Sequence, residues 1–372
     1  MRCRHVMSLR VLPTSCAAQA HRDRSPDLVR QSSSQMKTKT DIQPLSEREL
    51  CPDELLAGQE AAFARDIARL HARGDMVHVV CPACDANRSV KRFEKFGFLY
   101  ERCEECRTIY MNPRPSIEAM TDYYSKSENY AYWAKHIFPA SEATRREKIH
   151  KPWLERIIGY MEQFNVPRGT LLEVGPGFGT FSALAATSGA FERVLAIEPT
   201  PDLATACRLR GVDVIEKRVE EAASDVLRAS VVCAFEVIEH LFEPRQFITA
   251  VHRLLAPGGL LVLSCPNGEG FDIAMLGAGS LAVDAEHVNL FNPDSLRSLV
   301  ESAGFGVLTV HTPGRLDAEF VREAALKGAV RLDPFLQRVL IDEWDRLGWP
   351  FQVFLAEHSL SSHMWLAARR QY

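Results

Sequence analysis

Residues 170–181 read Thr170-Leu-Leu-Glu-Val-Gly175-Pro-Gly177-Phe-Gly179-Thr-Phe181, and this stretch decides the fold class. A short apolar run with the length of a strand leads into three glycines, and a helix-forming segment follows. Glycines at a strand-to-helix turn adopt backbone angles that other residues avoid, and they let a ligand contact the backbone. The stretch therefore predicts a ligand-binding turn, with a purely structural turn as the alternative.

The details of this stretch indicate which ligand binds. Dinucleotide-binding proteins carry G-x-G-x-x-G, whereas residue 180 is threonine here, so a dehydrogenase is disfavoured. Glu173 precedes the glycines, and a carboxylate there suits a positively charged ligand group better than a pyrophosphate. Glu198 ends the next predicted strand, where a carboxylate accepts hydrogen bonds from both ribose hydroxyls of an adenosine-containing cofactor.

Beyond residue 170, apolar runs alternate with helical patterns, which is typical of a parallel sheet in an α/β fold. The predicted strands are 170–174, 193–198, 212–215, 230–235, 259–264, 306–311 and 363–368. The predicted helices are 179–188, 201–210, 244–256 and 293–303, with a loop over 266–291. The pattern predicts a doubly wound sheet.

Four motifs occur in order across residues 170–265: E-V-G-P-G-F-G, I-E-P, F-E-V-I-E-H and L-A-P-G-G-L. Together they resemble the class I S-adenosylmethionine-dependent methyltransferases. The resemblance implies a Rossmann-like seven-stranded sheet whose last strand is antiparallel. It also implies a set of cofactor-binding residues: Glu173 near the amino group, Gly175, Gly177 and Gly179 around the methionine part, Glu198 at the ribose, Val219 near the adenine, and Phe235 and Glu236 at the tip of the fourth strand.

A second module is marked by four cysteines. Cys81-Pro-Ala-Cys84 and Cys103-Glu-Glu-Cys106 form two C-x-x-C pairs at the spacing of a Cys₄ zinc ribbon. Because four thiolates complete a tetrahedral site, the Zn²⁺ is expected to be structural. Redox-active pairs and disulfides are the alternatives. The chain resembles a bacterial subgroup in which such a ribbon precedes the methyltransferase domain and which includes sugar C-methyltransferases.

In proteins with such a sheet, ligands bind at the carboxyl ends of the parallel strands. The loops after residues 235 and 265 are therefore the expected acceptor-binding loops. His287 is the preferred catalytic base, oriented by Glu286 or Asn289, and His240 is the second candidate. The alternative is that either histidine only bridges secondary structure. The aromatic residues Tyr124, Tyr130, Tyr132 and Trp133 are expected to form a lid or acceptor pocket, or else a helical core.

The patterns divide the chain into five parts. They are a disordered basic tail (1–45), an N-terminal helix (46–75) with Ser46 and Glu49 as a capping box, the zinc ribbon (76–115), a helical lid or linker (116–165), and the methyltransferase domain (166–372) with a helical insertion at 316–362.

Charge and hydropathy limit the classes of molecule that the protein is expected to bind. The net charge is +6 over residues 1–40 and −10 over the rest, so nucleic acid is an unlikely partner. No run of 18 apolar residues occurs, which predicts no membrane span and a cytoplasmic protein. Nothing in the sequence indicates the oligomeric state.

We expect methyl transfer from S-adenosylmethionine to oxygen or carbon of a small-molecule or carrier-linked acceptor of sugar, polyketide or quinone type. The alternatives are a ribosomal-RNA base methyltransferase with a zinc ribbon and a non-catalytic zinc-ribbon interaction protein.

Overall fold

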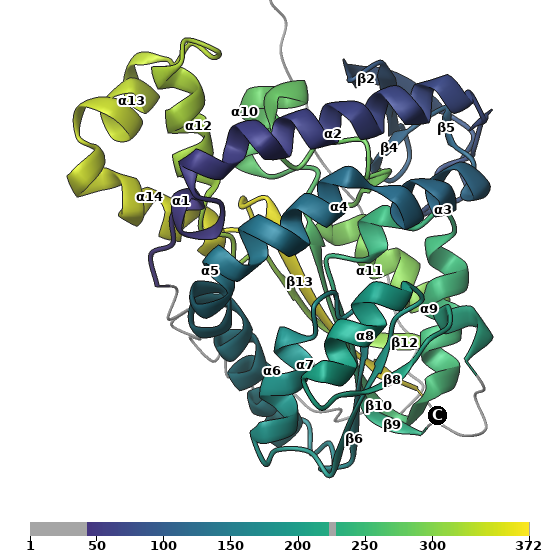
Figure 1. Ribbon diagram of the computed structural model, residues 1–372. Coiled ribbons are helices and arrows are strands. Elements are labelled where there is room, and N and C mark those ends of the chain that lie inside the picture. The colour runs from purple at the N-terminus through teal and green to yellow at the C-terminus, as the bar shows by residue number, and fades with distance from the viewer. Residues whose placement is uncertain (1–42, 223–227, 372) are drawn as a thin grey trace, which may run out of the picture. The chain divides into compact units, whose positions relative to one another are not determined.

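The computed structural model describes residues 43–222 and 228–371 (Figure 1). The basic tail predicted over 1–45 falls almost entirely outside the described residues. Over the two described segments, no helix combines the length and apolar character that crossing a bilayer requires.

The described residues contain a seven-stranded sheet in the order β12-β13-β10-β9-β6-β7-β8 (Figure 1). Strand β13 runs antiparallel to β10 and β12, whereas the other neighbouring strands are parallel. The predicted sheet with an antiparallel last strand is therefore confirmed. Its strands are β6 (Thr170–Val174), β7 (Arg193–Ile197), β8 (Asp213–Ile215), β9 (Ala229–Phe235), β10 (Leu255–Pro266), β12 (Phe305–His311) and β13 (His363–Arg370).

Helices cover both faces of this sheet, because its central strands are apolar on both sides. Alternate residues of β9 show the division. Val232 and Ala234 belong to a core cluster with α9 and α11, whereas Val231 and Cys233 pack in a cluster with α6 and α7. The predicted helices form as α7 (Thr180–Thr187), α8 (Pro201–Leu209), α9 (Pro244–Leu254) and α11 (Pro293–Ser302).

The predicted N-terminal helix is interrupted. Ser46 and Glu49 form the expected capping box, but α1 (Glu47–Leu50) ends at Cys51. Pro52 then stands at the start of a second helix, α2 (Asp53–Arg73). A proline has no N–H to donate to the preceding turn, so it begins a helix more readily than it continues one.

A four-stranded sheet in the order β11-β4-β3-β2 carries the cysteine pairs. Strands β2 (Ser89–Lys95), β3 (Phe98–Cys103) and β4 (Ile109–Met111) lie within the predicted ribbon, whereas β11 is Asn289–Leu290. The short strands β1 (Met76–Val77) and β5 (Arg114–Pro115) pair antiparallel as a separate two-stranded sheet. The expectation that 266–291 is all loop is therefore wrong, because this segment holds β11 and α10 (Phe271–Leu276).

Helices α3 to α6 lead from the ribbon to β6, as predicted for a helical linker. They are α3 (Ile117–Lys126), α4 (Glu128–Tyr132), α5 (Phe138–Arg145) and α6 (Lys151–Gln163), and wider π-type turns at Trp133–Ile137 and Arg146–His150 join the last three. The expected helical insertion contains α12 (Asp317–Leu326), α13 (Pro334–Gln337) and α14 (Trp344–Glu357).

A buried carboxylate anchors this linker to α2. Asp66, in α2, is fully buried and accepts hydrogen bonds from the Ser127 hydroxyl (2.6 Å), the Asn129 backbone N–H (2.9 Å) and the Glu128 backbone N–H (3.0 Å). It thereby satisfies donors that the first turn of α4 leaves without intrahelical partners.

Asp66→Ala is expected to lower the free energy of unfolding by about 2–3 kcal/mol, because it leaves these donors unsatisfied. Urea unfolding followed by circular dichroism measures the change. Asp75→Ala is the matched control, since Asp75 is exposed and pairs with Arg73, and its effect should stay within about 0.5 kcal/mol. Equal effects of the two substitutions would contradict the anchoring role of Asp66.

Candidate functional site

The glycine turn between β6 and α7 needs glycine for two different reasons. Gly175, Gly177 and Gly179 have φ values of 70°, 54° and 76°, in the region that other residues avoid. A Cβ at Gly175 would lie 2.7 Å from Val237 Cγ2, and one at Gly179 would lie 2.8 Å from Cys207 Sγ. Gly175 and Gly179 are therefore also required by packing inside the fold.

Gly177 differs from its two neighbours, because a Cβ there would meet no atom of the described residues within 4 Å. Its position borders a large cavity. At residue 177, glycine is therefore favoured by the backbone angle alone and not by packing. The space in front of Gly177 is free for a ligand.

Two carboxylates flank this turn. Glu198 directly follows β7, is buried, and accepts a hydrogen bond from the Thr200 backbone N–H (2.9 Å). Burial raises the pKa of Glu198, and the Thr200 and Gly177 N–H groups oppose that rise. Burial also raises the pKa of Glu173 to about 7, although the Ser182 hydroxyl donates to its carboxylate. A cation bound nearby would favour the ionised form of Glu173.

Both carboxylates line one cavity of about 1670 Å³. Pockets for one small molecule usually span roughly 300–1,000 Å³, so this cavity has room for two ligands. Among the cofactor residues expected from the sequence, Gly179 does not contact the cavity and packs behind it. Those that do are Glu173, Gly175, Gly177, Glu198, Val219, Phe235 and Glu236.

His240 and His287 line the same cavity, and their rings meet edge to face with centroids 4.7 Å apart. His287 Nδ1 lies 2.9 Å from the Ala282 carbonyl oxygen and 3.6 Å from Asp284 Oδ2. Donation from Nδ1–H to that carbonyl leaves Nε2 as a proton acceptor. Ala282 and Asp284 therefore orient His287, and the expectation that Glu286 or Asn289 does so is wrong.

The two histidines differ in their electrostatic surroundings. Burial and the neighbouring His287 lower the pKa of His240 to about 3. Burial also disfavours charge on His287, but Asp284 and the Ala282 carbonyl outweigh it and raise the pKa of His287 above its ordinary value.

Glu286 instead organises the tyrosines of the linker. It is buried and accepts hydrogen bonds from the hydroxyls of Tyr123 and Tyr130, the latter at 2.9 Å. The hydroxyl of Tyr124 lies 3.2 Å from His240 Nδ1. Burial and the charge of Asp284 raise the pKa of Glu286 to about 7. Glu286 does not itself line the cavity. It positions Tyr130, whose side chain does line the cavity.

Asn289 fixes the loop that carries His287. Its side-chain N–H group donates to the Leu241 carbonyl oxygen (2.7 Å), and its Oδ1 accepts from Arg114 (3.0 Å), which is fully buried. Arg114 also donates to the carbonyl oxygens of Met111 and Val288. Through Arg114 and Asn289, strand β5 is thereby tied to both loops that carry the histidines.

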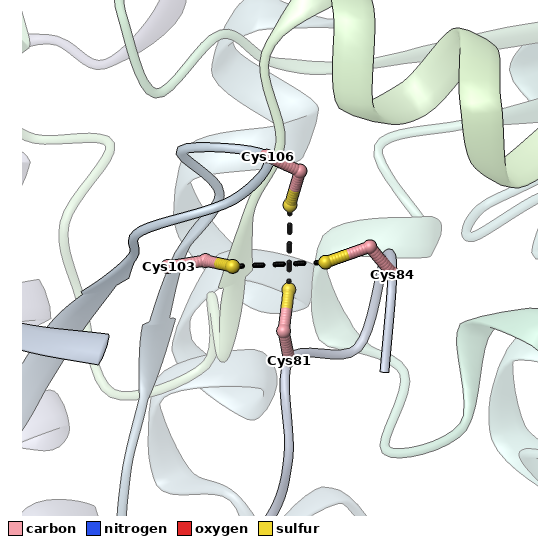
Figure 2. Close-up of side chains that lie close together, drawn as sticks. All are labelled: Cys81, Cys84, Cys103 and Cys106. Carbon is pink, nitrogen blue, oxygen red and sulfur yellow. Dashed lines mark hydrogen bonds between the residues drawn. The ribbon is translucent and has the colours of Figure 1, made fainter. Parts of the chain in front are cut away.

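The four cysteine thiols meet at one point. Figure 2 shows the two dashed contacts crossing, Cys81 Sγ to Cys106 Sγ at 3.4 Å and Cys84 Sγ to Cys103 Sγ at 3.6 Å. Two ligands of a tetrahedral Zn²⁺ with Zn–S bonds of about 2.3 Å lie about 3.8 Å apart. All four Sγ atoms lie within 4.8 Å of one another, so the donor set and its spacing fit zinc.

The cysteine knuckles are docked on the domain built around the seven-stranded sheet. Asn292 donates to the Cys106 carbonyl oxygen (2.8 Å), and Arg245 donates to that of Ala83 (3.0 Å). Strand β11 also pairs with β4, with Asn289 opposite Tyr110. The module that holds the cysteines therefore shares a sheet with the segment directly after His287.

Several cavity residues have no signal in the sequence. Trp153 lies in α6, and its ring is tilted against that of Phe235, with centroids 4.5 Å apart. His363 Nε2 lies 3.0 Å from Glu236 Oε1. Among the expected aromatic residues, Tyr124, Tyr130 and Trp133 line the cavity, whereas Tyr132 packs over Gly58 of α2. The expected acceptor pocket thus describes the first three residues, whereas the expected helical core describes Tyr132.

Comparisons with known proteins find a matching family and similar chains. The methyltransferase domain family matches residues 143–310. A Mycolicibacterium smegmatis protein named a probable S-adenosylmethionine-dependent methyltransferase is 30% identical over 185 residues, which cover 46% of this chain and 69% of the relative. A ubiquinone biosynthesis O-methyltransferase of Xanthomonas campestris is 29% identical over 181 residues, covering 46% of this chain and 74% of the relative. The crystal structure of an S-adenosylmethionine-dependent methyltransferase from Clostridium acetobutylicum aligns with 65% of this chain and 99% of its own, at 9% identity and a TM-score of 0.43.

Cys84→Ser is expected to reduce bound zinc from about one ion per chain to almost none, because three thiolates hold Zn²⁺ less tightly than four. Metal analysis of the purified protein measures this. Because β11 pairs with β4, amide exchange over 284–292 should also rise. Cys51→Ser is the control, since Cys51 is buried but lies outside the cluster. Unchanged zinc content in Cys84→Ser would exclude the Cys₄ site.

Proposed function

Since this chain belongs to the S-adenosylmethionine-dependent methyltransferases, we propose that it methylates an oxygen or carbon of a small-molecule or carrier-linked acceptor. The observation that carries the proposal is the cavity of about 1670 Å³. It is lined by the glycine turn and Glu198 at one end and by the two histidines with Tyr124 and Tyr130 at the other, so the proposed cofactor and acceptor residues face one continuous space.

The residues at the first end suit S-adenosylmethionine. The backbone at Gly175 and Gly177 would hold the methionine part, and Glu173 would accept from its ammonium group. Glu198 would accept from the ribose hydroxyls, and Val219 would pack against the adenine. When bound, the cofactor supplies a methyl group on a positively charged sulfur. The open space in front of Gly177 and the buried carboxylates support this assignment.

At the other end, His287 would accept the proton that an acceptor hydroxyl or carbon acid loses. Its Nε2 is the free proton acceptor, because Nδ1 is engaged by Ala282. His240, whose pKa is lowered to about 3, stays neutral and would hold the acceptor by hydrogen bonding. Glu286 would position Tyr130 at the cavity wall.

The acceptor class is proposed from the cavity lining and the relatives. Trp153, Phe235 and Tyr130 contribute aromatic surface, which suits a planar quinone-like or polyketide acceptor. Relatives named ubiquinone biosynthesis O-methyltransferases are consistent with transfer to oxygen. The net acidic charge of residues 41–372 supports a small molecule over RNA. At the four cysteines we propose a structural Zn²⁺.

Gly177→Arg is expected to weaken binding of S-adenosylhomocysteine by about 100-fold or more, because a side chain there would enter the space in front of the turn. Isothermal titration calorimetry measures the affinity. Gly189→Arg is the matched control: Gly189 has φ 71°, is exposed, and meets nothing within 4 Å in the described chain, but does not line the cavity. Wild-type affinity in Gly177→Arg would refute the cofactor placement.

A base must be neutral to accept a proton, so turnover should fall as pH drops below the pKa of His287. Because that pKa is raised, the acid limb should have its midpoint above pH 6.5. His287→Ala should lower kcat by about 10²–10⁴-fold and remove this limb, with unchanged S-adenosylhomocysteine affinity. The measurement uses the best acceptor from a panel of catechols and polyketide-type phenols.

His358→Ala is the control for this experiment, because His358 is exposed and bonds only to its own helix. It should retain the wild-type pH profile. An acid limb that survives in His287→Ala would assign the base to another group.

A further inference from the structure

The cavity extends beyond the histidines to a region lined by arginines. Arg156 lies in α6, and Arg315 lies in the loop between β12 and α12. Both are half-buried and line the cavity together with His363, at the start of β13. Neither arginine belongs to a sequence motif or to the cofactor and base residues assigned above.

Both guanidinium groups lack an acidic partner. Within residues 43–222 and 228–371, no carboxylate oxygen lies within 4 Å of Arg156 or Arg315. One NH group of Arg315 donates to the Lys148 carbonyl oxygen (2.8 Å), and Arg156 Cζ lies 5.1 Å from the centroid of the Trp365 ring. An arginine has five N–H donors, so most donors of both remain available.

Three acids near the arginines are engaged elsewhere. Glu236 interacts with His363 and accepts from the Ser264 hydroxyl (2.6 Å), and Glu49 pairs with Lys148. Asp317 accepts from Gln352 and Ser361. The other basic residues at this end, Lys148 and Arg145, already have partners, since Arg145 donates to Ser141 and to the Leu50 carbonyl oxygen.

Two like charges therefore share a space from which water is partly withdrawn. Burial lowers the pKa of Arg156 below its ordinary value. Burial, followed by the positive charge of Arg156, lowers the pKa of Arg315 to about 10. Unpaired charges that are partly buried cost stability, and an anion placed between the two arginines would offset that cost.

We propose that Arg156 and Arg315 bind an anionic oxygen group of the acceptor, either a phosphate or a carboxylate. Guanidinium groups bind both in a two-pronged geometry that lysine does not provide. The inference rests on the proposed function, because it assigns the ligand to the acceptor of that same cavity.

The aromatic wall between the two ends indicates the shape of this acceptor. Trp153 packs against Phe235, at the tip of β9, and its ring centroid is 5.7 Å from that of Trp365, on which Arg156 rests. An acceptor that reaches both ends would carry an apolar or planar part along this wall, with its anionic group on the arginines and its methyl-accepting atom toward the histidines.

The test measures anion binding to the full chain saturated with S-adenosylhomocysteine. Pyrophosphate and benzoate are titrated separately by calorimetry at constant ionic strength, so that the two kinds of anion are distinguished. We expect at least one of them to bind the wild-type protein. The double variant Arg156→Gln/Arg315→Gln should bind that anion at least tenfold more weakly. Lys151→Gln, an exposed position in the same helix, should leave the affinity unchanged.

Wild-type protein that binds neither anion, or a double variant that retains wild-type affinity, overturns the proposal. Affinity for S-adenosylhomocysteine is measured in parallel: its loss in the wild type would overturn the proposed function, whatever the anions do. If the double variant does not fold, the test uses crystals of the wild-type protein soaked in whichever of the two anions binds in solution. Density between the two guanidinium groups supports the proposal, and density only elsewhere overturns it.

Discussion

The pairing of β11 with β4 is the contact that supports the end of the cavity lined by His240 and His287, which we propose binds the acceptor. It is only two residues long, yet it joins the sheet that carries the four cysteines to the loop that carries His287. Arg114 and Asn289 reinforce it from within, because the buried guanidinium and the amide connect β4, β5 and both histidine loops. The cysteine module is thus a structural support of the cavity wall, and the Zn²⁺ proposed for it would stabilise the loop that carries His287.

Charge is distributed along the cavity in a way that matches the ligands proposed for it. At the cofactor end, Glu173 and Glu198 are buried carboxylates whose pKa values are raised, so a positively charged ligand with hydroxyl and ammonium donors would be favoured there. At the far end, Arg156 and Arg315 are unpaired cations within the described residues. Each end carries an electrostatic cost that its ligand would relieve, so binding at either end should stabilise the folded chain.

The helical linker connects these two ends. Asp66 holds the start of α4 against α2, and Glu286 holds Tyr123 and Tyr130 of the linker against the loop of His287. The π-type turns after α4 and α5 allow one nearly continuous helical run to follow the cavity from Tyr130 to Arg156. Cavity residues such as Tyr130 and Arg156 therefore come from a segment outside the sheet, as is common where a rigid scaffold carries binding residues on its connections.

The sequence by itself determined the parts whose chemistry is local. The glycine turn needs backbone angles that only glycine adopts readily, the knuckles need cysteines two residues apart, and buried parallel strands need continuous apolar runs. These signals predicted the sheet, its order of strands and helices, and the places of Gly177, Glu198 and the cysteine cluster.

The tertiary structure alone decided which distant residues meet. Glu286 contacts tyrosines more than 150 residues earlier in the chain, and Arg156 and Arg315 share one cavity. The fourth strand of the sheet that carries the cysteines is β11, which lies outside the predicted ribbon. No periodicity or spacing in the sequence marks such contacts, because a side chain's partner across the fold depends on how whole helices and strands pack. For the same reason the orientation of His287 by Ala282 and Asp284 could not be predicted from the residues next to it.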